Sequence, residues 1–188
     1  MNKIIKGIRK FKRIFRGILL LTLYRRNILI SSILNIDLAK NVIFTFVDRT
    51  SKLIIKGKLI VSNFVCIKIC ENANLEIGNR VFFNNYCSIT AMNQITIGNN
   101  CLFGENVHIY DHNHKYKDST QRVADQGFAI GGVTIGDNVW VGSNVTILKD
   151  VAIGNNCVIG AGCTVYKNIP DNHILLSNGQ IKSITEKN

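Results

Sequence analysis

The sequence predicts an all-β solenoid of short parallel strands, preceded by an amphipathic α-helix and interrupted by one long loop. Three observations give this prediction: a six-residue repeat of apolar residues, a single large break in that repeat over residues 111–132, and a basic N-terminal segment. With 188 residues, 46% of them apolar, the chain is long and apolar enough for one folded domain. We expect an arm over residues 1–36, a solenoid over residues 37–172 and a tail over residues 173–188.

The N-terminal arm holds most of the net charge. Residues 1–36 contain nine cations and no acid, whereas the remaining 152 residues contain 14 cations and 12 acids. Residues 3–22 show helical spacing of apolar residues, which predicts an amphipathic helix. Such a helix can lie on an anionic membrane surface, and it can equally pack on its own domain or on a neighbouring subunit. The positions on this face are Ile4, Ile8, Phe11, Phe15, Ile18 and Thr22, reinforced by Ile5, Ile14 and Leu19.

Composition also excludes several classes of protein. The uninterrupted apolar runs are far shorter than the ~20 residues of a membrane-spanning helix. Tyr24, Arg25 and Arg26 stand where a secretory signal would need small residues for cleavage. We therefore expect a cytoplasmic protein that lies at most at the inner face of the cell membrane. Nucleic acid is not an expected partner, because residues 37–188 are nearly neutral and no aromatic-interleaved RNA motif accompanies the arm.

The repeat advances in steps of six residues. All twelve repeat positions are apolar, and the next residue is glycine in seven of them. This period fits neither a helix of 3.6 residues per turn nor a plain two-residue strand alternation. It fits a chain in which short strands are joined by corners. Three six-residue units then close one triangular coil, with the apolar position inside. Looser repeats through Leu53, Leu59 and Val65 extend the solenoid to roughly six coils. The twelve positions are Ile77, Phe83, Ile89, Ile97, Phe103, Ile109, Ile135, Val141, Ile147, Ile153, Ile159 and Val165.

Four of the six cysteines fit the same repeat. They occupy the fifth position of the unit, where other units have valine, so we expect small apolar thiols inside the coils. Cys66 and Cys70 have no second pair at the spacing of a zinc site, and disulfides are not expected in an intracellular chain. Reduced thiols are therefore favoured over metal ligands. The four repeat cysteines are Cys87, Cys101, Cys157 and Cys163.

The sequence resembles the hexapeptide-repeat acyltransferases, especially the galactoside and maltose acetyltransferase-like branch, and is closest in type to the bacterial polysaccharide O-acetyltransferases. The resemblance covers about residues 41–170 and is most specific over Ile109–His114 and Val133–Gly142. It implies a left-handed parallel β-helix, a homotrimer with active sites between subunits, and acetyl-CoA as donor without a metal. The chain departs from the family at residues 130–132, where related chains often have a shorter apolar lead-in.

The long loop is the predicted active site. His108, His112 and His114 lie at its entrance, and a 22-residue excursion from a regular solenoid is typical of a functional loop. Acyl transfer to a sugar hydroxyl needs a base at neutral pH, which an imidazole can supply. The resemblance gives this role to His114. His112 is the second candidate base or an acceptor contact, and Asp111 is placed to orient an imidazole.

Donor binding is expected along the coils that follow the loop. The resemblance places Trp140, the only tryptophan, at the active site beside the thioester or the sugar, although it can also be simply a large residue on a coil face. The pantetheine arm of acetyl-CoA would pass small residues that allow close approach of the backbone, and Lys167 would meet its phosphates. The small residues are Gly142, Ser143, Gly160 and Ala161.

Together these features predict an acetyl-CoA-dependent O-acetyltransferase that modifies a hydroxyl of a bacterial surface saccharide (capsule, O-antigen or exopolysaccharide). The alternative reaction is N-acetylation of a nucleotide-linked amino sugar. A non-catalytic β-helix scaffold is another class, although it would not need the histidine loop. A β-helical zinc carbonic anhydrase is disfavoured, because its three histidines would be spread over separate coils and subunits.

Overall fold

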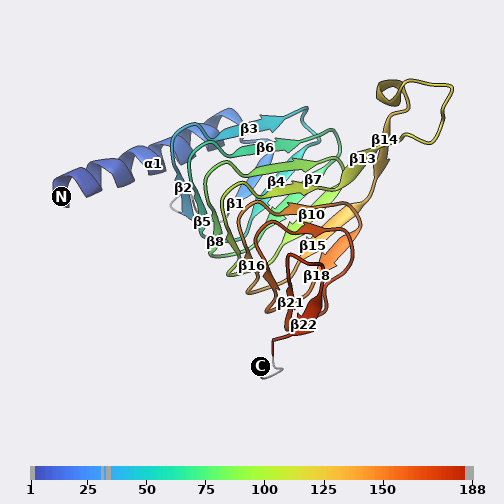
Figure 1. Cartoon of the computed structure of the whole chain (residues 1–188). Helices are drawn as coiled ribbons and strands as arrows, with labels where there is room; N and C mark the ends of the chain where they lie inside the picture. The colour runs from blue at the N-terminus through green and yellow to red at the C-terminus, as the bar shows by residue number, and fades with distance from the viewer. Residues whose placement is uncertain (1–2, 31, 33–34, 185–188) are drawn as a thin grey trace.

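The computed structural model describes residues 3–30, 32 and 35–184, and of residues 3–7 and 9 it describes the backbone alone. One helix, α1 (Lys3–Leu23), precedes a solenoid of about six coils (Figure 1). The predicted all-β solenoid and its N-terminal helix are confirmed. Within the described ranges, no helix is both long and apolar enough to cross a membrane.

Each complete coil contributes one strand to each of three sheets, which form the sides of a triangular prism. Sheet A contains, in order, β1 (Ile28–Ile30), β4 (Lys52–Ile55), β7 (Asn74–Ile77), β10 (Gln94–Ile97), β15 (Gly132–Ile135) and β18 (Val151–Ile153). Sheet B contains β2 (Ile36–Leu38), β5 (Leu59–Val61), β8 (Val81–Phe83), β11 (Leu102–Phe103), β16 (Trp140–Val141), β19 (Val158–Ile159), β21 (His173–Leu175) and β22 (Ile181–Ser183). Sheet C contains β3 (Ile43–Phe46), β6 (Cys66–Ile69), β9 (Ser88–Ala91), β12 (His108–Tyr110), β17 (Thr146–Ile147) and β20 (Thr164–Val165). All pairs in these sheets are parallel except that of β21 with β22.

The repeat positions fill the interior of the prism. All twelve are at most 2% exposed, which confirms the inward apolar position. Parallel register stacks equivalent residues of successive coils, as in the column Ile77, Ile97, Ile135 and Ile153 of sheet A. The four repeat cysteines are also buried, whereas Cys66 is exposed, and all six cysteines are free thiols. A continuous column of apolar side chains is therefore the core of the solenoid.

Asparagine and glycine occur at the corners of the coils for two different physical reasons. Asn100, Asn138 and Asn156 adopt positive φ, between 55° and 58°, at the corner from sheet A to sheet B. Gly98, Gly136 and Gly154, at the same corner, do not adopt positive φ. A Cβ on Gly98 would lie 2.6 Å from the backbone of Gly136 in the next coil, so glycine is required there by close stacking.

The solenoid begins earlier in the chain and ends later than the sequence repeat indicates. Strand β1 lies inside residues 1–36, and β21 and β22 lie inside residues 173–188. At the outer end of the first coil, α1 packs in place of another coil. Leu20 of α1 belongs to the buried core, and a Cβ on Gly17 would lie 3.2 Å from Ile36. The helix therefore closes the N-terminal end of the solenoid, as terminal caps of repeat proteins do.

Candidate active site

The repeat is broken at one corner, between sheets C and A, by a hairpin that projects from the prism (Figure 1). Its strands are β13 (His112–His114) and β14 (Phe128–Ile130), which pair antiparallel, with His112 opposite Ile130 and His114 opposite Phe128. The tip contains a short 3₁₀ helix, η2 (Val123–Asp125). The excursion that the sequence indicates over residues 111–132 is thus a hairpin with an irregular tip.

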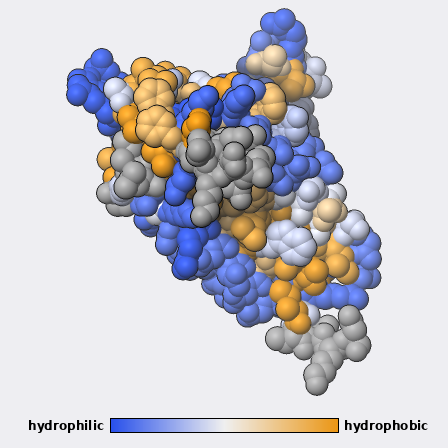
Figure 2. Space-filling model, turned by 90° about the vertical axis from the view of Figure 1, so that its left-hand side faces the viewer, coloured by the Kyte–Doolittle hydropathy of each residue, from blue (hydrophilic) through white to orange (hydrophobic). Residues whose placement is uncertain are grey.

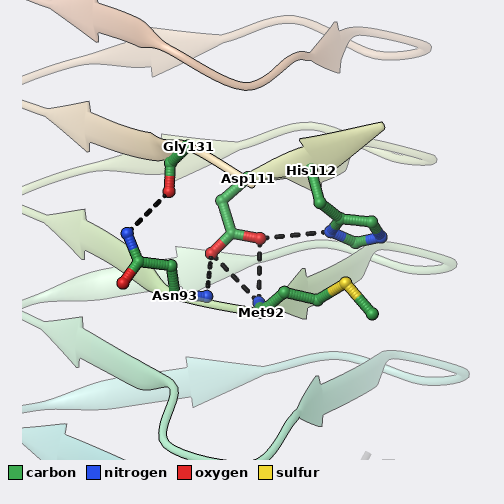
Figure 3. A network of polar contacts seen from close by, with 5 residues as sticks. All are labelled: Met92, Asn93, Asp111, His112 and Gly131. Atoms are coloured by element: carbon green, nitrogen blue, oxygen red, sulfur yellow. Dashed lines mark hydrogen bonds and ion pairs between the residues drawn. The ribbon is translucent and has the colours of Figure 1, made fainter. Parts of the chain in front are cut away.

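Asp111 anchors the base of this hairpin (Figure 3). Its side chain is fully buried, and its carboxylate accepts hydrogen bonds of 2.8 Å from the backbone N–H groups of Met92 and Asn93, at the same corner of the preceding coil. The Asn93 side chain donates to the carbonyl of Gly131 at 2.8 Å, and the Gly131 N–H donates to the carbonyl of Asp111 at 2.7 Å. Because Asp111 begins the hairpin and Gly131 ends it, these bonds fix both ends to one corner.

The same carboxylate orients His112. Oδ1 of Asp111 lies 3.1 Å from Nδ1 of His112, whose side chain is only 14% exposed. A carboxylate at Nδ1 favours the tautomer that carries its proton there and leaves Nε2 as an acceptor. The rings of Tyr110 and Phe128 contact this imidazole edge-on, at centroid distances of 6.1 and 5.5 Å. His112 is therefore held in one orientation.

His114 lies two residues further along β13, so both imidazoles project from the same face of the strand. Its side chain is exposed, and its ring lies against Phe128 at a centroid distance of 4.4 Å. Phe128, which no sequence pattern singled out, contacts both histidines. The hairpin thus presents one enclosed and one accessible imidazole on a shared aromatic support.

Sheet C continues this cluster along its outward face. Oγ of Ser88 lies 2.6 Å from Nδ1 of His108 and 3.4 Å from the hydroxyl of Tyr110. The rings of His108 and Tyr110 are nearly parallel, with centroids 6.2 Å apart. Sequence reasoning named His108 but missed Ser88 and Tyr110. The available signal was position, since all three occupy outward positions of two neighbouring strands of sheet C, β9 and β12.

Trp140 does not join this cluster within one chain. It lies on the outward side of sheet B and is 57% exposed, whereas the hairpin leaves the prism at the corner opposite sheet B. Leu102 and Val158 flank it in register, and Phe82 and Ile60 continue the outward row. Figure 2, which views the molecule from the sheet B side, shows apolar surface along this side. One chain therefore holds the histidines and the tryptophan on opposite sides.

The residues predicted to bind the donor follow Trp140 along sheet B and its corner with sheet C. Coil stacking explains two of them, because a Cβ on Gly142 would lie 2.7 Å from the backbone nitrogen of Ala161, and Gly160 is crowded by the following strand. The Ser143 hydroxyl accepts a hydrogen bond from the backbone N–H of Glu105 at 3.3 Å. These residues line one edge of the coils without forming an enclosed cavity.

Lys167 lies near the C-terminal end of the prism, beside a surface hollow. Thr164, Tyr166, Lys167 and residues 175–179 line this hollow. Nζ of Lys167 lies 5.9 Å from the centre of the Tyr166 ring, within range of a cation–π interaction. In the part of the chain that the structure describes, no group of three or more His, Cys, Asp or Glu side chains is arranged to hold a metal ion.

Two family descriptions match the coils on either side of the hairpin. "Bacterial transferase hexapeptide (six repeats)" matches residues 132–167, and "Hexapeptide repeat of succinyl-transferase" matches residues 94–109. Both matches fall on strands whose inward residues form the core. The repeat found in the sequence and the coils of the structure are thus the feature that this chain shares with these transferases.

Similar proteins extend these matches over most of the chain. "Putative acetyltransferase YJL218W" of Saccharomyces cerevisiae is 38% identical over 117 residues, which cover 61% of this chain and 59% of the relative, less than two thirds of its length. "Putative lipopolysaccharide biosynthesis O-acetyl transferase WbbJ" of Escherichia coli is 32% identical over 161 residues, covering 74% of this chain and 82% of the relative. The solved structure of the hexapeptide-repeat acetyltransferase VCA0836 of Vibrio cholerae, complexed with acetyl-CoA, has a TM-score of 0.62 and 25% identity, covering 71% of this chain and 72% of its own.

Proposed function

Because the chain belongs to the hexapeptide-repeat acyltransferase family, we propose that it transfers an acetyl group from acetyl-CoA to a hydroxyl of a bacterial surface saccharide. The observation that carries this proposal is the hairpin anchored by Asp111, which presents His112 and His114 on one face. The name of the E. coli relative supports a saccharide acceptor, and the V. cholerae complex supports acetyl-CoA as donor. The acceptor would be met at the inner face of the cell membrane, where lipid-linked saccharides are assembled.

His114 acts as the general base in this proposal. A sugar hydroxyl is a weak nucleophile at neutral pH, so its proton must be taken up as the oxygen attacks the thioester carbonyl. His114 is exposed on the hairpin and accessible to an acceptor. The imidazole accepts the proton as the O–C bond forms and returns it to the CoA sulfur as the C–S bond breaks.

His112 serves as an acceptor contact through Nε2. Its fixed orientation suits a hydrogen bond to a second hydroxyl of the saccharide, which would align the attacking oxygen. It is also the second candidate base. Among the described residues, His112 is the histidine that has a carboxylate at its ring, and such a pair stabilises the imidazolium formed during proton transfer.

A homotrimer would complete the site, because one chain keeps its histidines and Trp140 on opposite sides. In this arrangement, sheet B of one copy faces the hairpin side of the next, and the apolar row beside Trp140 is buried between them. Acetyl-CoA would lie along this seam, with its phosphates near Lys167. Its pantetheine arm would pass Gly142, Ser143, Gly160 and Ala161. Sedimentation equilibrium should give about 63 kDa, three times the 21.0 kDa chain mass.

The function is tested by mass spectrometry of surface polysaccharide from cells with and without the gene. The expected result is one additional acetyl group per modified unit, present only with the gene. Mild alkali then separates the two reactions, because an O-acetyl ester is hydrolysed and an N-acetyl amide is not. Identical polysaccharides in both strains, together with no release of CoA by the purified protein on saccharide acceptors, would refute the proposal.

A further inference from the structure

Helix α1 leaves a row of large apolar residues exposed. These side chains are spaced three or four residues apart, which places them on one face of the helix, and Phe11 is the most exposed at 71%. A surface helix of a globular protein normally packs this face on the core. Here the face is open within one chain. Its residues are Ile8, Phe11, Phe15, Leu19 and Leu23.

The opposite face of α1 holds the helix on the first coil. The guanidinium of Arg13 pairs with the carboxylate of Asp37, and Arg16 donates to the carbonyl of Leu38 at 3.2 Å. Leu20 enters the core, and Gly17 allows the helix to approach the coil closely. Polar bonds and a buried leucine thus fix the helix with its apolar face outward. This face is a stable feature of the fold.

Charge indicates what covers this face. Lys10 and Lys12 on the helix and Arg25 and Arg26 beyond it are exposed, and residues 1–36 contain no acid. A second copy offers no strongly acidic surface to match, because residues 37–188 carry 14 cations against 12 acids. An anionic lipid bilayer matches both properties, since its acyl region receives apolar side chains and its headgroups attract cations.

We propose that α1 is an interfacial membrane helix, with its outward apolar face inserted at the surface of an anionic bilayer. It lies on the membrane rather than across it, because α1 is not apolar enough to span. The solenoid is attached to the solvent side of the helix through Arg13, Arg16 and Leu20. This inference stands apart from the chemistry proposed at the hairpin.

The fixed packing of α1 also sets the orientation of the bound protein. The helix covers the end of the solenoid where the first coil begins, and the hairpin β13–β14 rises toward that same end (Figures 1 and 2). The hairpin tip carries the exposed side chains of Tyr116, Val123, Lys115 and Lys117. A bilayer that receives α1 therefore also meets this tip. A saccharide carried on a membrane lipid would approach the histidines from this side, a step that rests on the proposed function.

Vesicle co-sedimentation tests membrane binding with the full chain. The wild type should bind phosphatidylcholine vesicles that contain phosphatidylglycerol, bind neutral vesicles weakly, and lose binding as salt rises. Replacing Phe11 and Phe15 together by serine should lower partitioning roughly tenfold to hundredfold, because two exposed aromatic anchors are lost while the packing on the first coil is kept. The matched control replaces Tyr166 and Ile184, exposed near the other end of the prism, by serine and should bind like the wild type.

Two outcomes would overturn the proposal. One is a wild type that does not bind anionic vesicles. The other is a Phe11/Phe15 variant that binds like its control but has a lower oligomeric mass, which would assign the apolar face to contact between copies.

Orientation is tested by quenching with brominated lipids. In a Trp140→Phe background, Tyr116→Trp should be quenched and Tyr166→Trp should not, since these positions lie at opposite ends of the prism. Equal quenching of the two, or none at Tyr116→Trp, would overturn the orientation. Neither measurement uses acetyl transfer, so the failure of the proposed function would leave both results interpretable.

Discussion

The hairpin corner and the outward face of sheet B are built on the same six-residue units, yet they differ in polarity. The corner gathers Asp111, His112 and His114, held by backbone hydrogen bonds from the preceding coil. Sheet B presents Trp140 and Leu102 in an apolar row. Packing of the core allows only apolar side chains at inward positions, so polar and reactive side chains can be placed only at outward positions and corners. One chain keeps the histidines and the apolar row on opposite sides of the prism, so in the proposed trimer they would meet between copies.

Replacing His114, the proposed base, should have the largest effect on the rate of acetyl transfer. His114→Ala should lower acetyl transfer roughly 10²–10⁴-fold, because the attacking hydroxyl then keeps its proton. CoA release from acetyl-CoA at saturating acceptor measures this rate. His112→Ala should cost less, mostly in acceptor affinity, and His173→Ala is the matched control, since that histidine lies in strand β21, away from the hairpin. Near-normal turnover in His114→Ala with none in His112→Ala would exchange the two roles.

Mixing two inactive variants tests whether the two sides meet between copies. His114→Ala and Trp140→Ala, denatured together and refolded at equal amounts, should recover about a quarter of wild-type activity, because in a random trimer one seam in four joins an intact histidine to an intact tryptophan. Each variant refolded alone should stay inactive. A mixture no more active than its components would show that both residues serve one chain.

The sequence was sufficient to predict the interior of the solenoid, because a six-residue period directly reports which side chains point inward. It located the hairpin for the same reason, as the only large break in that period. It did not predict that Ser88 meets His108, since that contact joins two coils and depends on their register. It also did not predict that arginines dock α1 on the first coil. Helical spacing shows which residues share a face but gives no information on what that face contacts.

Stability should separate the anchored base of the hairpin from its tip. Asp111→Ala removes a fully buried carboxylate that accepts part-buried hydrogen bonds from the N–H groups of Met92 and Asn93, so the free energy of unfolding should fall by about 2–5 kcal/mol. Asp118→Ala is the control at the tip. There the side-chain hydroxyl of Thr120 lowers the pKa of an exposed carboxyl, and its loss should leave global stability near that of the wild type. Urea unfolding measures both, and equal losses would contradict the anchoring role of Asp111.

Stability in alkali should depend on the thiols inside the coils. Burial raises the pKa of Cys87 and of Cys101 from 9.0 to about 11. The folded-state pKa lies above the unfolded value, so the neutral thiol contributes its full share of the free energy of unfolding below the unfolded pKa. That share is lost as the pH rises toward the folded pKa. Between pH 9 and 11 the free energy of unfolding should therefore fall as pH rises, because the unfolded thiols ionise before the folded ones.

Valine substitution isolates this contribution from the other groups that titrate in alkali. Cys87→Val with Cys101→Val should flatten the alkaline slope relative to the wild type and change stability at neutral pH by less than about 1.5 kcal/mol, because valine is apolar, adds only one methyl-sized group and fits this position in other coils. Cys66→Val, at an exposed thiol, is the control for the substitution itself. Urea unfolding on both sides of pH 9 measures the difference, and an unaltered slope in the double variant would mean that these thiols do not ionise on unfolding. Valine already fills the equivalent position at Val81, Val107, Val139, Val145 and Val151, which is why the coils should accept the change.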